Sequence, residues 1–176
     1  MDGSIDVKDL VFVDEAGSKL GMSSDYARAQ GGQRAEVKEP RNQGKNISLL
    51  GAMSLTGIVA LMYCTCSVNS SVFLTFVKEF LCPHLKKGQI VIMDNINFHR
   101  TQAVSEAIKS VGASVVFLPP YSPELSPIEN MWSKLKTYLK SKSPNTLGDY
   151  HQFLAEGLST ITDDDCEAWF DHCRYM

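Results

Sequence analysis

The chain has 176 residues, 44% of them apolar, with a formal net charge of −3 and a pI near 5.8. This length and apolar content suit one domain with a sizeable core, so we expect a single domain over residues 1–176. The acidic balance excludes a protein that coats nucleic acid through bulk positive charge, although it allows a local basic surface.

An apolar run predicts the first strand, from Leu10 to Asp14. Residues 17–44 then form a polar segment with several glycines, too long for a turn and too basic for a core. We interpret this segment as a binding loop.

The next segment, Ile47 to Cys66, has no charged residue and has the length of a membrane span. Thr56-Gly57 interrupts it, however, and β-branched and small residues dominate both halves. The pattern therefore predicts two strands joined by a tight turn, at about 46–54 and 58–67.

Helices and strands alternate in the second half of the chain. The expected helices lie at about 72–80, 103–111, 127–140, 147–160 and 164–172, and the expected strands at about 89–94 and 114–118. This order is compatible with an α/β domain in which a mixed sheet carries helices on both faces.

The cysteine pattern bears on the compartment. Five cysteines form an odd set, and Asp2, Asp6 and Asp9 stand where a secretory signal would carry basic residues. We therefore expect reduced thiols in a cytoplasmic protein. The cysteines and histidines are not paired at the spacing of structural zinc ligands.

Three acidic residues are the candidates for chemistry. Asp14 and Asp94 each end an apolar run, and Glu129 lies near the start of a helix. Strand ends expose side chains to a shared cleft, so we expect the three carboxylates to converge. Their repulsion calls for a cation, and oxygen-only ligands favour Mg²⁺ or Mn²⁺, with two ions for a phosphodiester. The alternative for Glu129 is a capping box with Ser126.

Three motifs carry these acids. They are Val11-Phe12-Val13-Asp14-Glu15, Val91-Ile92-Met93-Asp94-Asn95 with His99 following, and the proline-rich block from Leu118 to Glu129. Asp94 and Glu129 are separated by 34 residues. Together the motifs resemble the DDE transposases of bacterial insertion sequences related to the mariner superfamily, over nearly the whole chain.

The resemblance implies a ribonuclease-H-like fold with a mixed five-stranded sheet. It also implies that Asp14, Asp94 and Glu129 are catalytic residues that bind Mg²⁺ or Mn²⁺, and that the protein moves a DNA element by cut-and-paste transposition. Element ends and target DNA are then the expected partners, in the cytoplasm, at the nucleoid if the source is bacterial, and away from membranes.

One feature departs from the family. Members resembling this chain carry an N-terminal helix-turn-helix region that finds the terminal inverted repeats, whereas 13 residues precede Asp14 here. We therefore expect a DDE catalytic domain alone, with the helix-turn-helix region absent. A separate end-binding helix-turn-helix subunit and a homodimer are candidate partners.

Several neighbouring residues have two interpretations. His99 is a candidate for orienting Asp94 or contacting the scissile phosphate, and its alternative is local packing. Asn95 is a further accessory candidate, although it also suits the turn after a strand. Glu124 lies in the same block as Glu129 and competes with it.

Basic residues cluster after Asp14 and on the helix that carries Glu129. A solvated face is the ordinary interpretation, but nearness to the acids favours contact with DNA. The candidate DNA contacts are Arg34, Lys38, Arg41, Lys134 and Lys136.

The leading hypothesis is a metal-dependent polynucleotidyl transferase that nicks DNA and transfers the freed strand. A second hypothesis is a ribonuclease-H-like nuclease that hydrolyses nucleic acid without strand transfer. The third is a catalytically silent remnant that binds DNA or a partner subunit.

Overall fold

A computed structural model describes residues 5–22, 44–120 and 122–176. Its centre is a five-stranded sheet in the order β3-β2-β1-β4-β5. The strands are β1 (Leu10–Lys19), β2 (Asn46–Ser54), β3 (Gly57–Cys64), β4 (Ile90–Met93) and β5 (Ser114–Phe117). β1, β2 and β3 pair antiparallel, while β1, β4 and β5 pair parallel, so the predicted mixed five-stranded sheet is confirmed.

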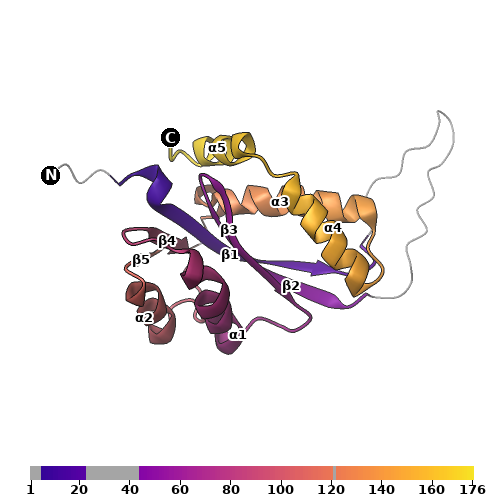
Figure 1. The fold of residues 1–176 in the computed structure, drawn as a ribbon, viewed down its shortest axis with the longest axis horizontal. Helices are drawn as coiled ribbons and strands as arrows, with labels where there is room; N and C mark the ends of the chain where they lie inside the picture. Colours follow the sequence, from indigo (N-terminus) through magenta and orange to yellow (C-terminus); the bar gives the residue numbers. More distant parts are fainter. Residues whose placement is uncertain (1–4, 23–43, 121) are drawn as a thin grey trace.

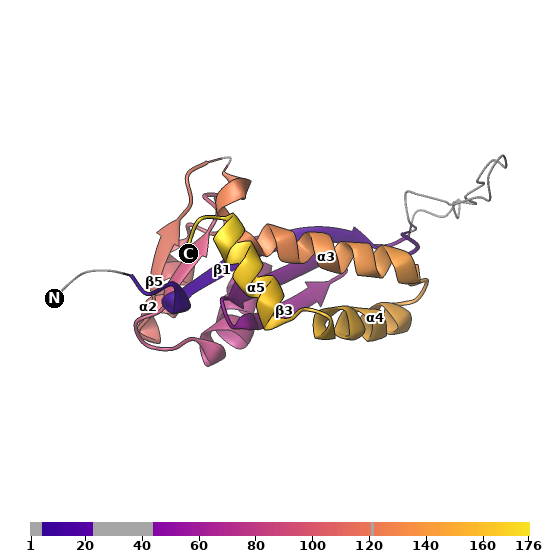
Figure 2. The ribbon, with the colours of Figure 1, turned by 90° about the horizontal axis from the view of Figure 1, so that it is seen from above.

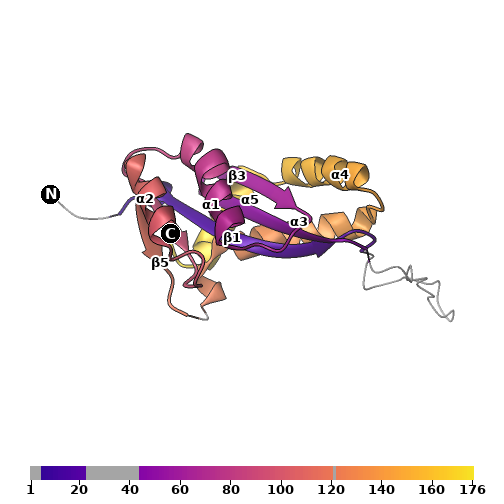
Figure 3. The ribbon, with the colours of Figure 1, turned by 90° about the horizontal axis from the view of Figure 1, so that it is seen from below.

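Helices cover both faces of the sheet, as predicted (Figure 1). One face carries α3 (Pro127–Lys142), α4 (Leu147–Ser159) and α5 (Asp163–His172), which Figure 2 shows from above. The other carries α1 (Ser70–Thr75), the π-helical segment Phe76–Leu81 and α2 (Gln102–Ser110), which Figure 3 shows from below.

Strand alternation divides the core into two layers. Phe12 of β1 packs into the layer with α3, α4 and α5, whereas Val11 and Val13 pack into the layer with α1 and α2. Both layers are closed by large side chains that solvent does not reach, among them Trp132 and Phe73. The central strand is therefore held from both sides.

The uncharged segment forms the predicted hairpin. β2 and β3 meet at a tight turn in which Gly57 has a φ of +118°, a conformation that favours glycine. Among the described residues, no helix is long and apolar enough to cross a membrane.

The prediction that the first strand ends at Asp14 is wrong. β1 continues to Lys19 because its antiparallel register with β2 runs on to the pair Lys19↔Asn46. The expected binding loop therefore begins after the strand, and its residues 23–43 lie outside the described part of the chain.

The β1–β4 register sets the position of the site. Val13 of β1 pairs with Met93, the last residue of β4, so Asp14 and Asp94 follow at the same level of the sheet. β1 goes on past this point while β4 stops. The sheet thus opens beside Asp14.

Candidate active site

Asp14 lies in the middle of β1, on the face covered by α3. Its carboxylate Oδ2 accepts a hydrogen bond of 3.0 Å from the indole Nε1 of Trp132. Trp132 belongs to α3 and is 1% exposed, so a core side chain from a distant part of the chain holds this carboxylate.

Asp94 follows β4 directly, and the buried side chain of His99 holds its carboxylate. The imidazole Nδ1 of His99 contacts Asp94 Oδ1 and lies 3.3 Å from the Asp94 carbonyl oxygen. The His99 ring is fully buried, with its centroid 4.1 Å from that of Phe73 and 4.7 Å from that of Phe98. The Asp94 side chain itself is 45% exposed, so it faces the opening.

Glu129 lies in the first turn of α3. The capping box that was its alternative role does not form, since Ser126 is the N-cap residue but its side chain makes no capping hydrogen bond. Only the backbone closes the turn, with Glu129 N–H donating to the Ser126 carbonyl oxygen at 3.1 Å. The exposed Glu129 carboxylate is therefore available to the pocket.

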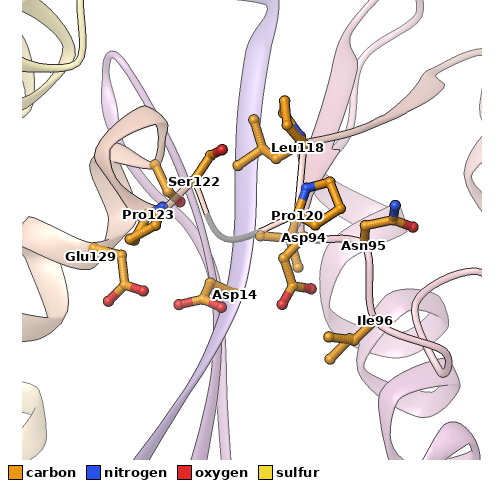
Figure 4. Close-up of a pocket in the computed structure, with 12 residues that line it drawn as sticks. Asp14, Asp94, Asn95, Ile96, Leu118, Pro120, Ser122, Pro123 and Glu129 are labelled. Atoms are coloured by element: carbon orange, nitrogen blue, oxygen red, sulfur yellow. The ribbon is translucent and has the colours of Figure 1, made fainter.

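The three acids line one pocket of about 340 Å³, as the sequence predicts. Figure 4 shows Asp14 between Glu129 and Asp94. The proline-rich segment also lines the pocket, with Leu118, Pro119, Pro120, Ser122 and Pro123, and Asn95 and Ile96 lie at the end of β4. Each of these prolines has its own φ fixed by its ring.

The pocket concentrates negative charge. The pKa of Asp14 is raised from 3.8 to about 7, mainly by burial and also by the charges of Glu129 and Asp94, while hydrogen bonds from Glu15 N–H and Trp132 oppose the rise. Burial also raises the pKa of Glu15, whose side chain alternates to the other face of β1 near His99. The fold therefore holds acids in surroundings that penalise their charge.

This donor set fits a hard divalent cation. The described residues that line the pocket offer carboxylate, amide and hydroxyl oxygens, with no thiol or imidazole among them. A cation would also offset the charge that raises the pKa of Asp14. Within the described ranges, however, no three acidic, histidine or cysteine side chains are already grouped closely enough to hold a metal ion.

The other predicted site residues are placed differently from one another. Asn95 lines the pocket, while His99 lies behind Asp94. Glu124 lies in the short helical turn Pro123–Leu125, is exposed, and is not among the described lining residues. Arg34, Lys38 and Arg41 lie outside the described residues.

The two lysines of α3 that are candidate DNA contacts differ in their surroundings. Lys134 Nζ donates a hydrogen bond of 2.9 Å to the Thr160 carbonyl oxygen. It also forms an ion pair with the carboxylate of Asp165, which connects α3 to α5. Lys136 instead lines a groove beside β1. Lys136 is thus the stronger candidate for contact with DNA.

Sequence reasoning expected Trp132 in the core but missed its hydrogen bond to Asp14. A signal was present, because Trp132 stands three residues after Glu129 and therefore on the same side of the helix. A core tryptophan on the face that presents an acid is a candidate donor to that site.

Solved structures of Mos1 transposase share this fold. The Mos1 transposase paired-end complex with left transposon end has a TM-score of 0.80 and 17% identity, covering 96% of this chain and 53% of that chain. The Mos1 strand transfer complex has a TM-score of 0.79 and 17% identity, covering 96% of this chain and 52% of that chain. The catalytic domain of Mos1 mariner transposase has a TM-score of 0.75 and 14% identity, covering 96% and 78%.

These matches confirm the predicted ribonuclease-H-like fold, and the chain spans about half the length of the Mos1 chains in the two complexes. No curated protein sequence matches significantly. A family model described as DDE superfamily endonuclease matches residues 9–149, which run from just before β1 into α4. Since this match covers most of the chain and both motif-bearing strands, the chain belongs to the DDE superfamily endonucleases.

Proposed function

We propose that this chain is the catalytic domain of a transposase, which cleaves DNA and joins the freed 3′-hydroxyl to target DNA in cut-and-paste transposition. The observation that carries the proposal is the single pocket that Asp14, Asp94 and Glu129 line from three separate parts of the chain. Membership of an endonuclease superfamily supports it. So does the fold shared with Mos1 complexes named for a transposon end and for strand transfer.

Asp14, Asp94 and Glu129 are the proposed catalytic residues, as ligands of two Mg²⁺ or Mn²⁺ ions. Such ions supply Lewis acidity at the phosphodiester and lower the pKa of the attacking hydroxyl. The chain itself supplies position, because β1 fixes Asp14 while the end of β4 and the first turn of α3 present Asp94 and Glu129. The buried surroundings of Asp14 strengthen its attraction to a cation.

His99 and Asn95 take accessory roles in this proposal. The buried His99 ring lies between the aromatic rings of its layer and the Asp94 carboxylate, so it limits the rotation of that carboxylate. The Asn95 amide lies at the pocket rim, where it can hydrogen-bond a phosphate oxygen.

A basic groove further along β1 and α3 is the proposed track for the DNA backbone. It has a volume of about 480 Å³ and is lined by Lys19, Lys136 and Lys140 together with the polar side chains of Ser18, Asn46, Ser48 and Ser67. No acidic residue is among the described residues that line it. Ammonium, hydroxyl and amide donors without a carboxylate suit phosphate oxygens.

β1 and α3 each extend from the pocket to the groove. Lys19 is five residues beyond Asp14 on β1, about 16 Å at 3.3 Å per residue. Lys136 follows Glu129 by two helical turns of α3 and so lies on the same side of that helix. At about 3.4 Å per nucleotide, the groove would meet phosphates roughly five nucleotides from the reacting bond.

The proposed reaction also defines the partners. Residues 1–176 act as one catalytic domain, and a separate helix-turn-helix subunit recognises the element ends. Two catalytic domains, one for each end, form the working assembly. With DNA as substrate, the protein works at the nucleoid if the host is a bacterium.

A strand-transfer assay tests the proposal directly. A pre-cleaved duplex ending in the inverted repeat that flanks the gene is incubated with a plasmid target, Mg²⁺ or Mn²⁺, and the encoded end-binding subunit. Covalent joining of the duplex to the plasmid is the expected result. Nicking of the plasmid without joining would favour the nuclease hypothesis, and the absence of both nicking and joining would favour the silent remnant.

Removing any one acid should abolish the reaction while leaving the fold intact. Asp94→Asn and Glu129→Gln each delete a proposed ligand at nearly constant volume. Groups that only support a ligand cost 10–100-fold when changed, so cleavage should fall by at least about 100-fold. Glu124→Gln is the matched control from the same block and should cleave like the parent. Comparable cleavage by Glu129→Gln would exclude its assigned role.

The buried charge of Asp14 should make stability depend on pH. Because its pKa in the folded state is about 7, above the ordinary 3.8, the folded state binds the proton more tightly. The contribution of Asp14 to stability in EDTA should therefore be highest below about pH 4 and be lost as the pH rises through 7. Asp14→Asn removes this loss and should be more stable than the parent at pH 8, by on the order of 2–4 kcal/mol.

Urea unfolding from pH 4 to 8 measures this difference. Asp171→Asn, an exposed aspartate on α5, is the control and should follow the parent curve. Added Mg²⁺ should stabilise the parent at pH 8 but not Asp14→Asn, since only the parent keeps the ligand. Parallel curves for the parent and Asp14→Asn would show that the carboxylate carries no such penalty.

Removing the groove charge at position 136 should weaken DNA binding through loss of a phosphate contact. Lys136→Ala should reduce the slope of log affinity against log salt by about 0.9, to the same extent for all DNA sequences. Fluorescence anisotropy with labelled duplex measures it. Lys109→Ala, an exposed lysine of α2 on the other face, should leave the slope unchanged. Equal slopes for both variants would make Lys136 an ordinary surface charge.

A further inference from the structure

We propose that Trp132 and Gly51 act together as positioning residues for Asp14: the indole, seated against the bare backbone of Gly51, holds the carboxylate in place for metal binding. This inference rests on the proposed metal site but assigns a task to two residues that are not ligands. It makes the tryptophan part of the site as well as of the core.

The hydrogen bond is the first support. Trp132 Nε1 donates to Asp14 Oδ2 over 3.0 Å across 118 residues of sequence. An indole nitrogen is a donor only, so it can orient a carboxylate without competing for a cation. Because Trp132 is 1% exposed, its ring has little freedom to rotate. The indole therefore holds the Asp14 carboxylate in one orientation.

The second support is the absence of a side chain at residue 51. Gly51 of β2 pairs directly with Asp14 of β1. A Cβ atom there would lie 2.6 Å from Cη2 and 2.9 Å from Cζ2 of Trp132. These are atoms of a rigid buried ring, which cannot move aside as the end of a flexible side chain would.

Backbone conformation does not explain this glycine. Gly51 is not among the described glycines with positive φ, and it lies in regular register with β1, while the register shift between β2 and β3 comes after it, between Ala52 and Met53. Glycine weakens the interior of a strand and often marks a close approach by another group. Here the approaching group is the indole that bonds to Asp14.

α3 joins this arrangement to the third acid. Glu129 and Trp132 are three residues apart, so one side of the helix presents both the carboxylate and the indole. A displacement of Trp132 would therefore move the helix that carries Glu129. The pair Gly51 and Trp132 sets the distance between α3 and β1 at the level of the acids.

A tryptophan that only filled space would behave differently. Trp132→Phe keeps an aromatic ring in the core but removes the N–H donor, so a packing role predicts a modest loss of stability and normal metal binding. A positioning role predicts weaker metal binding in a folded protein. Gly51→Ala offers the complementary change, since it keeps the donor and displaces the ring.

Metal binding without catalysis is the first readout. Free Mn²⁺ is followed by electron paramagnetic resonance in the parent, Trp132→Phe and Gly51→Ala, with circular dichroism to establish folding. Mn²⁺ affinity should fall 10–100-fold in both variants, the range for groups that support a ligand. Parent-like affinity in folded Trp132→Phe overturns the inference while leaving the metal site in place. A parent that binds no Mn²⁺ overturns the proposed metal site and this inference with it.

Tryptophan emission is the second readout and needs no change at Trp132. The chain has two tryptophans, and the other, Trp169, lies on α5 outside the described pocket lining. In a Trp169→Phe background, Mg²⁺ should shift the emission of Trp132, and adding Asp14→Asn should remove the shift. Mn²⁺ binding by the parent with no Mg²⁺-dependent change in emission would overturn the inference even if the core variants fail to fold.

Discussion

The parallel pairing of β1 with β4 is the constraint on which the site depends. It places Val13 beside Met93, so the aspartates that follow each of them lie at one level of the sheet. β4 then stops while β1 runs on against β2, which opens the sheet on one side of Asp14 and keeps it closed on the other. Two acids are thereby brought together by backbone hydrogen bonds, which their mutual repulsion is too weak to break.

The helix that supplies the third acid is positioned by its apolar face. Ile128, Trp132 and Leu135 are buried against the sheet, and their burial fixes α3 in both height and rotation. Glu129 stands between two of these residues in sequence and projects from the edge of that face. Its direction is thus set by hydrophobic packing, since the capping interaction with Ser126 that would have drawn it back to its own helix does not form.

What the sequence predicts well is what local pattern controls. Periodicity and turn residues predict the hairpin of β2 and β3, the later helices, and the acids that end apolar runs. The length of β1 escapes this reasoning because it is decided by pairing with β2, more than 25 residues away. The same holds for the partners of Trp132 and Lys134, which lie 118 and 31 residues away along the chain. Neither partner follows from spacing alone, although the motifs of the family locate the pocket itself.

The three acids differ in freedom, and this difference suits the proposed role. Asp14 is held by a strand and an indole in surroundings that raise its pKa, whereas Asp94 and Glu129 have exposed side chains. Repulsion among them explains why no described group of three is already drawn together, since each exposed carboxylate gains hydration by standing apart. A bound cation would offset the repulsion between the carboxylates and so favour their approach. In the proposed role Asp14 is the fixed point and His99 holds the Asp94 carboxylate at the opening. Glu129 then needs only side-chain rotation to reach the cation, so the backbone can stay still while the site closes.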